Sequence, residues 1–479
     1  MNKLVKNYIY NMLYQIFLII VPLFTAPYLT RTLTSNSLGV HDYITSIVSI
    51  ITTIGLLGLQ SYGYRQIAYF RDDLRAVNKE FSSIFQLRLV LLLIITIFYL
   101  PIVCRLEYKT YFLIQYALIA AQFLDISWVF IGFEDLGIVS FRNFLAKFIT
   151  VIGIFIFIKN DDDLWIYFAL FAFSTFFTVL SIYPMMRKHV RFQKVSMRTS
   201  IKHLLPAVKL FIPQIATLLY LQFDKVMIKQ ITESASQVAY YSYAEKIIHI
   251  PLAVITALGT VMMPRFANLH SNDNKEAISQ YLKKTIEFAM FLSIPMMAGL
   301  IAIAKGFIPW YLGEEYLASA TAIIVLSPLC IINALTNILG AQYLTAINKT
   351  NALTLAYYSA AICNIVLNAI LIPHFGYIGA AIATVVCSLV SVIIQYIYVR
   401  KDVVFTGIFK QIAKNIISAV IMFVIINITV QLAPVSIWST ALEIFIGCLS
   451  YVAISFILKD EILSYVLKKS VSLIFRKKT

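Results

Sequence analysis

The sequence predicts an all-α polytopic membrane protein of about 14 transmembrane helices, built as two six-helix bundles plus two C-terminal helices. Three observations support this fold class. The 479 residues are 60% hydrophobic and only 13% charged, which is far outside the soluble range. Apolar runs long enough to cross a bilayer recur along the whole chain. The layout of the first half of the chain also returns in the second half.

The apolar runs define the candidate spans. Each must be a helix, because a segment in lipid has to satisfy its own backbone hydrogen bonds and the alternating pattern of a barrel is absent. The candidate spans are 7–30, 40–63, 81–104, 110–133, 138–158, 164–186, 205–229, 238–264, 279–304, 317–343, 351–372, 377–399, 412–432 and 437–457.

These spans divide the chain into five segments. We expect an N-terminal six-helix bundle over 1–186, a basic cytoplasmic linker over 187–204 and a C-terminal six-helix bundle over 205–400. Two additional transmembrane helices follow over 401–458. The segment 459–479 is predicted to be a basic amphipathic cytoplasmic tail that lies along anionic lipid headgroups.

The distribution of Lys and Arg predicts the orientation. The net charge of +16 does not indicate nucleic-acid binding, because the basic residues recur in every second loop. With both termini in the cytoplasm, few of the 39 Lys and Arg residues fall in outer loops. These few are Arg31, Arg105, Lys109, Lys159, Lys229 and Lys305. The four Trp residues, Trp128 among them, are expected in the interfacial belts.

The two halves of the chain share the order of their segments more than the identity of their residues. RTLTSNSLGVHDY (Arg31–Tyr43), a span and then RQIA at Arg65 parallel KQITESASQVAYYSY (Lys229–Tyr243), a span and then RFAN at Arg265. Six crossings return the chain to the same side, so the two bundles are related by a pseudo-twofold axis along the membrane normal. A cleft between such bundles is the expected substrate route.

Charged residues inside the predicted spans are the first candidates for a functional site, because they are costly in lipid. Arg88, Asp125 and Lys147 lie on three consecutive spans at a similar predicted depth, with Arg142 just below them. The four could line an aqueous cleft. Alternatively, they could neutralise one another within the first bundle, as buried pairs often do. The sequence leaves both interpretations open.

A second set of charges is predicted toward the outer leaflet. Adjacent residues on a helix point about 100° apart, so the pairs in this set cannot all be neutralised within one helix. We therefore favour a functional role for the second-half members, whereas Arg31 is also typical of an interfacial anchor. The set comprises Asp224, Lys225, Glu245 and Lys246, with Arg31 and Asp42 as their counterparts in the first half.

The sequence contains no recognised enzyme site. No phosphate-binding glycine loop, Gly-x-Ser-x-Gly, HExxH or CxxC motif occurs in a suitable context. The five cysteines lack the paired spacing of a disulfide framework or metal site, so no cofactor or metal is predicted. Energy for transport then comes from an H⁺ or Na⁺ gradient, from the membrane potential or from the gradient of the substrate.

Several segments together resemble a known family. The chain is similar to the Wzx-type flippases of polysaccharide biosynthesis, in the multidrug/oligosaccharidyl-lipid/polysaccharide (MOP) exporter superfamily. The resemblance covers nearly the whole chain. It is carried by NYIYNMLYQIFLIIVPLFTAPYLTRTL with LGVHDY, GLLGLQSYGYRQIAYFRDD, DISWVFIGFEDL with FRNFLAKFITVIGIFIFIKNDDD, LLYLQFDKVMI with YSYAEKII, and HFGYIGAAIAT.

The resemblance implies a flippase that moves an undecaprenyl-diphosphate-linked oligosaccharide across the bacterial plasma membrane by ion-coupled alternating access. Basic groups would attract the diphosphate, and acidic groups would bind an ion and shift the conformational balance. The expected substrate-binding residues are Arg31, Arg88, Arg142, Lys147, Lys225 and Lys246. The expected ion-coupling or gating residues are Asp42, Asp125, Asp224 and Glu245.

The resemblance also implies partners, and it leaves alternative functions open. We expect a monomer in contact with membrane lipids, a lipid-linked oligosaccharide, a polysaccharide polymerase and a chain-length regulator, and no nucleic acid. One rival is a multidrug or toxin exporter of the same superfamily. Another is a membrane polymerase or ligase, which typically needs a large outer loop that this chain lacks. A channel or scaffold is less favoured, because no ring of repeated charges occurs.

Overall fold

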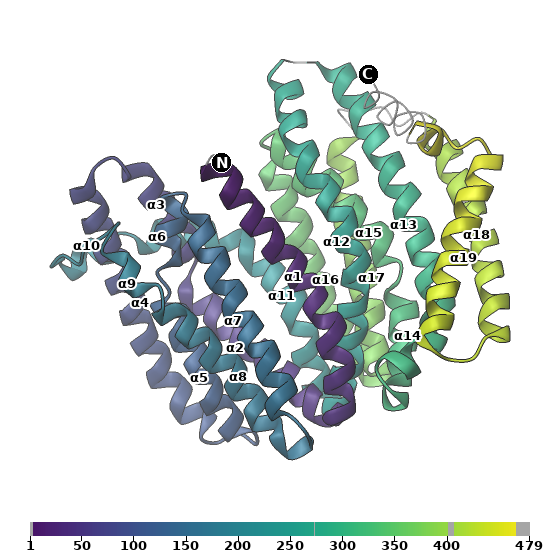
Figure 1. Cartoon of the computed structure of the whole chain (residues 1–479). Coiled ribbons are helices and arrows are strands. Elements are labelled where there is room, and N and C mark those ends of the chain that lie inside the picture. Colours follow the sequence, from purple (N-terminus) through teal and green to yellow (C-terminus); the bar gives the residue numbers. More distant parts are fainter. Residues whose placement is uncertain (1–2, 273, 401–406, 466–479) are drawn as a thin grey trace. The chain divides into compact units, whose positions relative to one another are not determined.

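The structure, a computed structural model, describes residues 3–272, 274–400 and 407–465. The predicted tail over 459–479 therefore lies largely outside the described residues. Contacts divide the chain into unit 1, Met1–Lys229, and unit 2, Gln230–Thr479, which are described separately below (Figure 1). The described residues form helices and turns without strands, as the sequence predicts for an all-α membrane protein.

Unit 1 packs helices that are distant in sequence against each other. α1 lies along α7, α5 along α8, and α4 lies beside α3 and α5. The helices are α1 (Lys3–Thr32), α2 (Ser35–Leu56), α3 (Leu59–Phe70), α4 (Leu74–Val103), α5 (Lys109–Leu124), α6 (Ser127–Gly132), α7 (Leu136–Phe157), α8 (Leu164–Leu180), α9 (Tyr183–Met186), α10 (Met197–Ile201) and most of α11 (Leu204–Thr232), with a 3₁₀ turn η1 (Asp161–Asp163).

Unit 2 is organised around the 37-residue helix α13, which contacts α12, α14, α15, α18 and α19. Figure 1 shows α18 and α19 beside α13 at the edge of this unit. Its helices are α12 (Ala235–Ser271), α13 (Lys275–Tyr311), η2 (Glu314–Tyr316), α14 (Leu317–Leu326), α15 (Leu329–Thr336), the π-helix η3 (Asn337–Leu344), α16 (Thr350–Phe375), α17 (Tyr377–Val399), α18 (Ile408–Leu432) and α19 (Ile437–Ile457).

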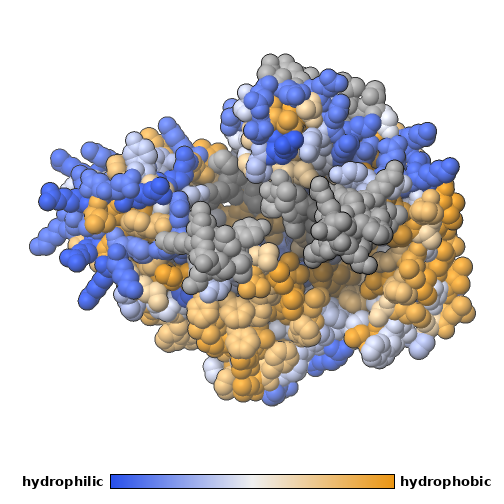
Figure 2. Space-filling view, turned by 45° about the horizontal axis from the view of Figure 1, so that its top comes forward, coloured by the Kyte–Doolittle hydropathy of each residue, from blue (hydrophilic) through white to orange (hydrophobic). Residues whose placement is uncertain are grey.

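The helix lengths agree with a polytopic membrane protein. In the described part of the chain 11 helices are long and apolar enough to cross a membrane, or up to 12 if one bent pair counts as a span. α11 and α12, at the predicted spans 205–229 and 238–264, are 29 and 37 residues long. Figure 2 shows hydrophobic side chains along the flanks of the units and hydrophilic ones toward their ends.

Several of the predicted continuous spans are broken, among them 40–63 and 317–343. The helix predicted over 40–63 ends at Leu56, because Leu57 and Gly58 adopt positive φ angles of 48° and 76°. A side chain at Gly58 is excluded, since its Cβ would lie 2.7 Å from the carbonyl oxygen of Ala207. The span predicted over 317–343 bends by 49° between α14 and α15, where Pro328 lacks the backbone N–H that a continuous helix needs.

Trp128 was expected in an interfacial belt, and that prediction is wrong. Its side chain is fully buried in the core of unit 1, where it packs against Phe81 and the backbone of Gly63. This core is formed mainly by α3, α4 and α6, together with residues after α8 and at the start of α11. The short helix α6 is therefore covered on all sides by protein.

The start of α11 is fixed to unit 1 by a cluster of three polar side chains. His203, directly before α11, is buried, and its Nδ1 lies 3.0 Å from the Tyr62 hydroxyl oxygen, at hydrogen-bonding distance. Oε2 of Glu80 lies 3.7 Å from the same nitrogen. These contacts and the close approach at Gly58 attach the start of α11 to unit 1. They explain why unit 1 extends to Lys229, about 25 residues beyond the end of the predicted linker 187–204.

This cluster predicts a pH-dependent attachment of α11. Burial lowers the pKa of His203, so the undocked imidazole binds a proton more readily than the docked one. The docked state therefore loses stability as the pH falls below about 6.5. The protection factor for hydrogen–deuterium exchange in the peptide 204–212, which is the intrinsic rate divided by the observed rate, should fall on acidification in the wild type and not in His203→Gln. The same acid response in both proteins would contradict the prediction.

Candidate functional site

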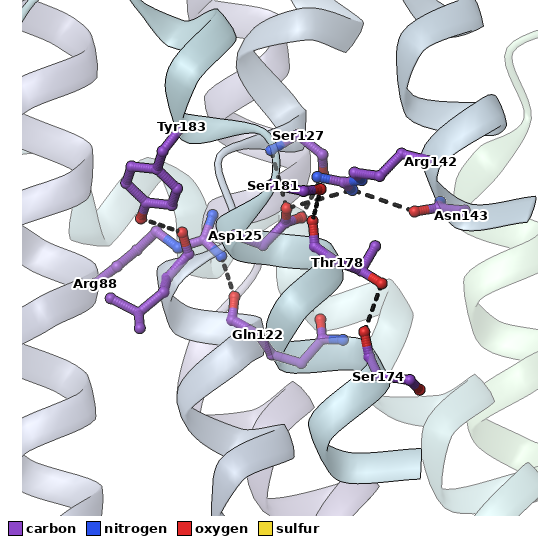
Figure 3. Close-up of polar contacts among 11 residues, drawn as sticks. Arg88, Gln122, Asp125, Ser127, Arg142, Asn143, Ser174, Thr178, Ser181 and Tyr183 are labelled. Atoms are coloured by element: carbon purple, nitrogen blue, oxygen red, sulfur yellow. Dashed lines mark hydrogen bonds and ion pairs between the residues drawn. The ribbon is translucent and has the colours of Figure 1, made fainter. Parts of the chain in front are cut away.

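The site with the most charge inside unit 1 lies where α5 ends and α6 begins. We call it the polar centre and define it by Arg88 of α4, Asp125 and Ser127 at the break, Arg142 of α7 and Tyr183 of α9 (Figure 3). The sequence analysis predicted a continuous helix over 110–133. Instead, Asp125 has extended backbone angles, and α6 begins two residues later.

The break exposes backbone carbonyls inside a membrane segment, and the polar centre satisfies them. The last carbonyls of α5 have no N–H one turn ahead to bond. Arg88 donates from Nε to the Phe123 carbonyl at 3.0 Å and from Nη2 to the Gln122 carbonyl. The Tyr183 hydroxyl donates to the Leu124 carbonyl at 2.6 Å. A cation at a helix C-terminus also interacts favourably with the helix dipole.

Asp125 completes the turn into α6. Its Oδ1 accepts a hydrogen bond from the backbone N–H of Ser127 at 3.1 Å, and its Oδ2 accepts from the Ser127 hydroxyl. An aspartate that bonds the N–H two residues ahead stabilises a turn and starts the following helix. The carboxylate thus fixes the break from the α6 side, as Arg88 and Tyr183 fix it from the α5 side.

Arg142 extends from α7 toward Asp125, and only some of its hydrogen-bond donors have described partners. Its Nη2 lies 3.8 Å from Oδ1 of Asp125 and donates to Oδ1 of Asn143 at 3.2 Å. Its Nε and Nη1 are buried and have no hydrogen-bond partner in the described part of the chain. The side chain keeps 12% exposure, whereas Arg88 has none. Arg142 therefore has two buried donors without a partner among the described residues, on a side chain that keeps some exposure.

The sequence left two interpretations open for these charges, an aqueous cleft and mutual neutralisation within the first bundle, and the geometry of the polar centre bears on the second. Its side chains lie within one unit, and Arg88 and Asp125 hold a backbone break together. The formal charges of Arg88, Asp125 and Arg142 leave one positive charge in excess. The assignment of Arg88 to substrate binding and of Asp125 to ion coupling stays a prediction, and the geometry gives both residues a structural task.

Lys147 does not join this cluster through a described contact with Asp125. Its ammonium lies 4.6 Å from the centre of the Phe171 ring on α8, in a cation–π contact. Five residues separate it from Arg142, which places the two about 140° apart around α7. They therefore lie on different sides of α7, and the expected meeting of Lys147 with Arg88 and Asp125 at one level stays a prediction.

The predicted first-half residues near the other end of unit 1 have local contacts. Arg31 is exposed at the end of α1, and its Nη1 donates to the Pro27 carbonyl at 2.7 Å. Asp42 lies in α2, with Oδ1 3.3 Å from Nδ1 of the buried His41. The turn before α2 is tied to the loop after α7, because Asp161 accepts a hydrogen bond from the Thr34 backbone N–H at 2.8 Å.

The predicted second-half residues belong to different units. Asp224 is 1% exposed and Lys225 is half-buried on the part of α11 that belongs to unit 1. Glu245 is half-buried and Lys246 is exposed on α12 of unit 2, where the Lys246 ammonium lies 4.3 Å from the centre of the Tyr243 ring. Their convergence on a shared cleft stays a prediction.

Sequence reasoning missed Ser127 and Tyr183 in the polar centre. The Asp-Ile-Ser spacing at 125–127 is typical of an aspartate turn and was a usable signal for the break. Tyr183 carried no such signal, since its partner is a backbone carbonyl distant in sequence. Two buried asparagines of α16 were also overlooked. Nδ2 of Asn368 donates to Oδ1 of Asn364 at 3.1 Å.

The role of Arg88 can be tested by stability. Arg88→Ala leaves two buried carbonyls without donors, which should cost about 2 kcal/mol or more, and Arg88→Lys should recover only part of this because it cannot bond both. The Tm of the purified protein in detergent measures the loss. Arg105→Ala, at an exposed loop position, is the matched control. A wild-type Tm for Arg88→Ala would show that the carbonyls are satisfied in another way.

Residues 4–270 match the family described as polysaccharide biosynthesis protein, and residues 210–370 match the MatE family. The chain is 26% identical over 378 residues to a putative O-antigen transporter of Shigella dysenteriae, a match that covers 76% of this chain and 91% of that protein.

Other relatives match over shorter stretches. The chain is 25% identical to the probable low-salt glycan biosynthesis flippase Agl15 of Haloferax volcanii and 24% identical to the lipid II flippase MurJ of Bacillus subtilis. These matches span 47% and 39% of the length of those two proteins.

Solved structures show the same fold. Lipid II flippase MurJ in an inward closed conformation superposes with a TM-score of 0.75 at 18% identity, over 95% of this chain and all of that one. An inward-facing multidrug resistance MATE transporter of the MOP superfamily gives a TM-score of 0.65 at 14% identity, over 85% of this chain and 99% of that one. Since its family match covers more than half of the residues, this chain belongs to the polysaccharide biosynthesis protein family.

Proposed function

We propose that this protein is a flippase that moves undecaprenyl-diphosphate-linked oligosaccharide units across a bacterial plasma membrane for polysaccharide synthesis. The similarity to O-antigen transporters supports the class of cargo. The observation that carries the chemistry is Arg142, whose Nε and Nη1 are buried in a membrane unit and have no hydrogen-bond partner within the described part of the chain.

The headgroup chemistry fits this site. A diphosphate diester carries two negative charges, and a guanidinium can bind it through two parallel hydrogen bonds. Arg142 supplies the free donors, while Asp125 on its other side holds the side chain in place. Arg88 adds positive charge from behind without touching the ligand, because its guanidinium is fully buried on the α5 carbonyls.

Coupling to an ion gradient is the second part of the proposal. An acid that binds H⁺ or Na⁺ more tightly in one conformation shifts the balance between inward-open and outward-open states. Asp224 is the most buried of the acids proposed from the sequence, and Lys225 follows it directly on α11. Asp42, Asp125 and Glu245 remain further candidates.

The cellular setting follows from the same proposal. We place both termini in the cytoplasm on the basis of the Lys and Arg distribution. A monomer that hands its cargo to a polysaccharide polymerase and a chain-length regulator fits the proposed pathway. A multidrug exporter is the second candidate function, supported by the MatE match over 210–370. The MATE structure covers 85% of this chain, compared with 95% for MurJ, which favours the flippase.

The first prediction of this proposal concerns Arg142. In proteoliposomes that contain a fluorescent undecaprenyl-diphosphate oligosaccharide, Arg142→Ala should slow flipping about tenfold or more, since it removes charge-assisted hydrogen bonds worth about 1.5–3 kcal/mol. Arg142→Lys should keep intermediate activity and Arg105→Ala full activity. Flipping at the wild-type rate by folded Arg142→Ala would exclude this residue from headgroup binding.

The second prediction concerns Asp224. Asp224→Asn keeps the size of the side chain but removes its charge, so it should abolish ion-driven transport while the protein stays folded in the membrane. Transport driven by an imposed H⁺ or Na⁺ gradient measures the effect. Asp162→Asn, an exposed loop variant, is the control. Gradient-driven flipping that persists in Asp224→Asn would assign coupling to another residue.

A further inference from the structure

The bundle of α13, α18 and α19 contains an acid that the proposed mechanism does not use. Glu443 of α19 is 3% exposed, and its Oε2 is buried without a hydrogen-bond partner among the described residues. Its neighbours Leu442 and Ile444 are about half exposed, at 49% and 51%. Glu443 therefore points into the protein from a helix whose adjacent side chains face outward.

The surroundings of Glu443 follow from the contacts one turn away on each side. Toward the end of α19, a Cβ at Gly447 would lie 2.8 Å from Cδ1 of Ile426 on α18, so this layer is apolar and tightly packed. Toward its start, Nε1 of Trp310 on α13 donates to Oγ1 of Thr440 at 2.8 Å. Glu443 lies between these two layers, about 5–6 Å from each along the helix.

No cation among the described side chains faces Glu443 from the helices packed against it. Lys305 on α13 lies at a similar height, but it is exposed and five residues from Trp310, which places it about 140° around the helix from the face that meets α19. Lys283 and Glu287 of α13 and Lys410 and Lys414 of α18 lie toward the opposite end of the bundle. There Nζ of Lys414 donates to the Lys459 carbonyl at 2.9 Å.

A carboxylate without a counter-ion in such a place costs more than its protonated form. We propose that Glu443 is a proton-binding site, occupied by a neutral carboxylic acid while α13, α18 and α19 are packed together. When the bundle opens to water, the O–H bond breaks, the proton passes to water and the carboxylate remains. The ligand of this site is thus H⁺ rather than a metal ion, and the inference names a coupling ion for the proposed transport.

Protonation of Glu443 should stabilise the packed bundle of α13, α18 and α19. Because the packed bundle favours the neutral acid and the opened bundle favours the carboxylate, the packed arrangement loses stability as the pH rises. A gradient that delivers protons to Glu443 would therefore favour closure of this bundle, and their release would favour its opening.

Infrared difference spectroscopy of the whole protein in detergent tests the proton directly. The wild type should show a carbonyl band of a protonated carboxylic acid that shifts in D₂O, and Glu443→Gln should lose it. Glu287→Gln is the matched control, because Glu287 is also buried on α13 but lies 3.9 Å from Nζ of Lys283. An unchanged protonated-acid band in Glu443→Gln would overturn the proposal.

A second measurement, the pH dependence of the Tm, tests the proposal even if Glu443→Gln packs poorly. The Tm of the wild type should fall more steeply with rising pH than that of Glu443→Gln, since glutamine cannot ionise. Equal slopes would also overturn the proposal. Neither experiment needs a cargo, so a protein that flips no lipid-linked oligosaccharide but loses the band in Glu443→Gln would refute the proposed function and leave this inference standing.

Discussion

The constraint on which unit 1 depends is that a backbone carbonyl inside a membrane segment needs a donor from the protein itself. α5 stops at Leu124, well inside a predicted span, and its last carbonyls would be orphaned there. The guanidinium of Arg88 and the hydroxyl of Tyr183 satisfy them, and Asp125 starts α6 on the other side of the break. A charged group is thus tolerated in the membrane because the chain is broken beside it.

This constraint separates two roles that the sequence alone had merged. Arg88 is fully buried, and its Nε and Nη2 donate to backbone carbonyls, so its charge acts on the site from a distance. Arg142 lies 3.8 Å from Asp125 and keeps two buried donors without partners among the described residues. In the proposed flippase, we infer that Arg88 shapes the site and that Arg142 binds the headgroup.

The sequence was sufficient for the fold class, because span length and Lys and Arg placement follow directly from the bilayer. Hydropathy is continuous across 110–133 and did not reveal the break at Asp125, although the Asp-Ile-Ser spacing was a usable signal for it. The donors that satisfy the freed carbonyls come from α4 and α9, so no local pattern predicts them. The meeting of Lys147 with Asp125 stays a prediction, and the ammonium of Lys147 lies against Phe171 on α8. Glu443 was visible as an acid within a predicted span but was passed over, because only its burial without a partner distinguishes it.

The central claim is that the polar centre binds a lipid diphosphate through Arg142. The most direct measurement is a cryo-electron microscopy structure of the intact protein in lipid nanodiscs with undecaprenyl diphosphate. We expect diphosphate density within hydrogen-bonding distance of Nε and Nη1 of Arg142, with Arg88 still on the α5 carbonyls. Diphosphate density away from Arg142, with its guanidinium turned to other protein groups, would contradict the claim.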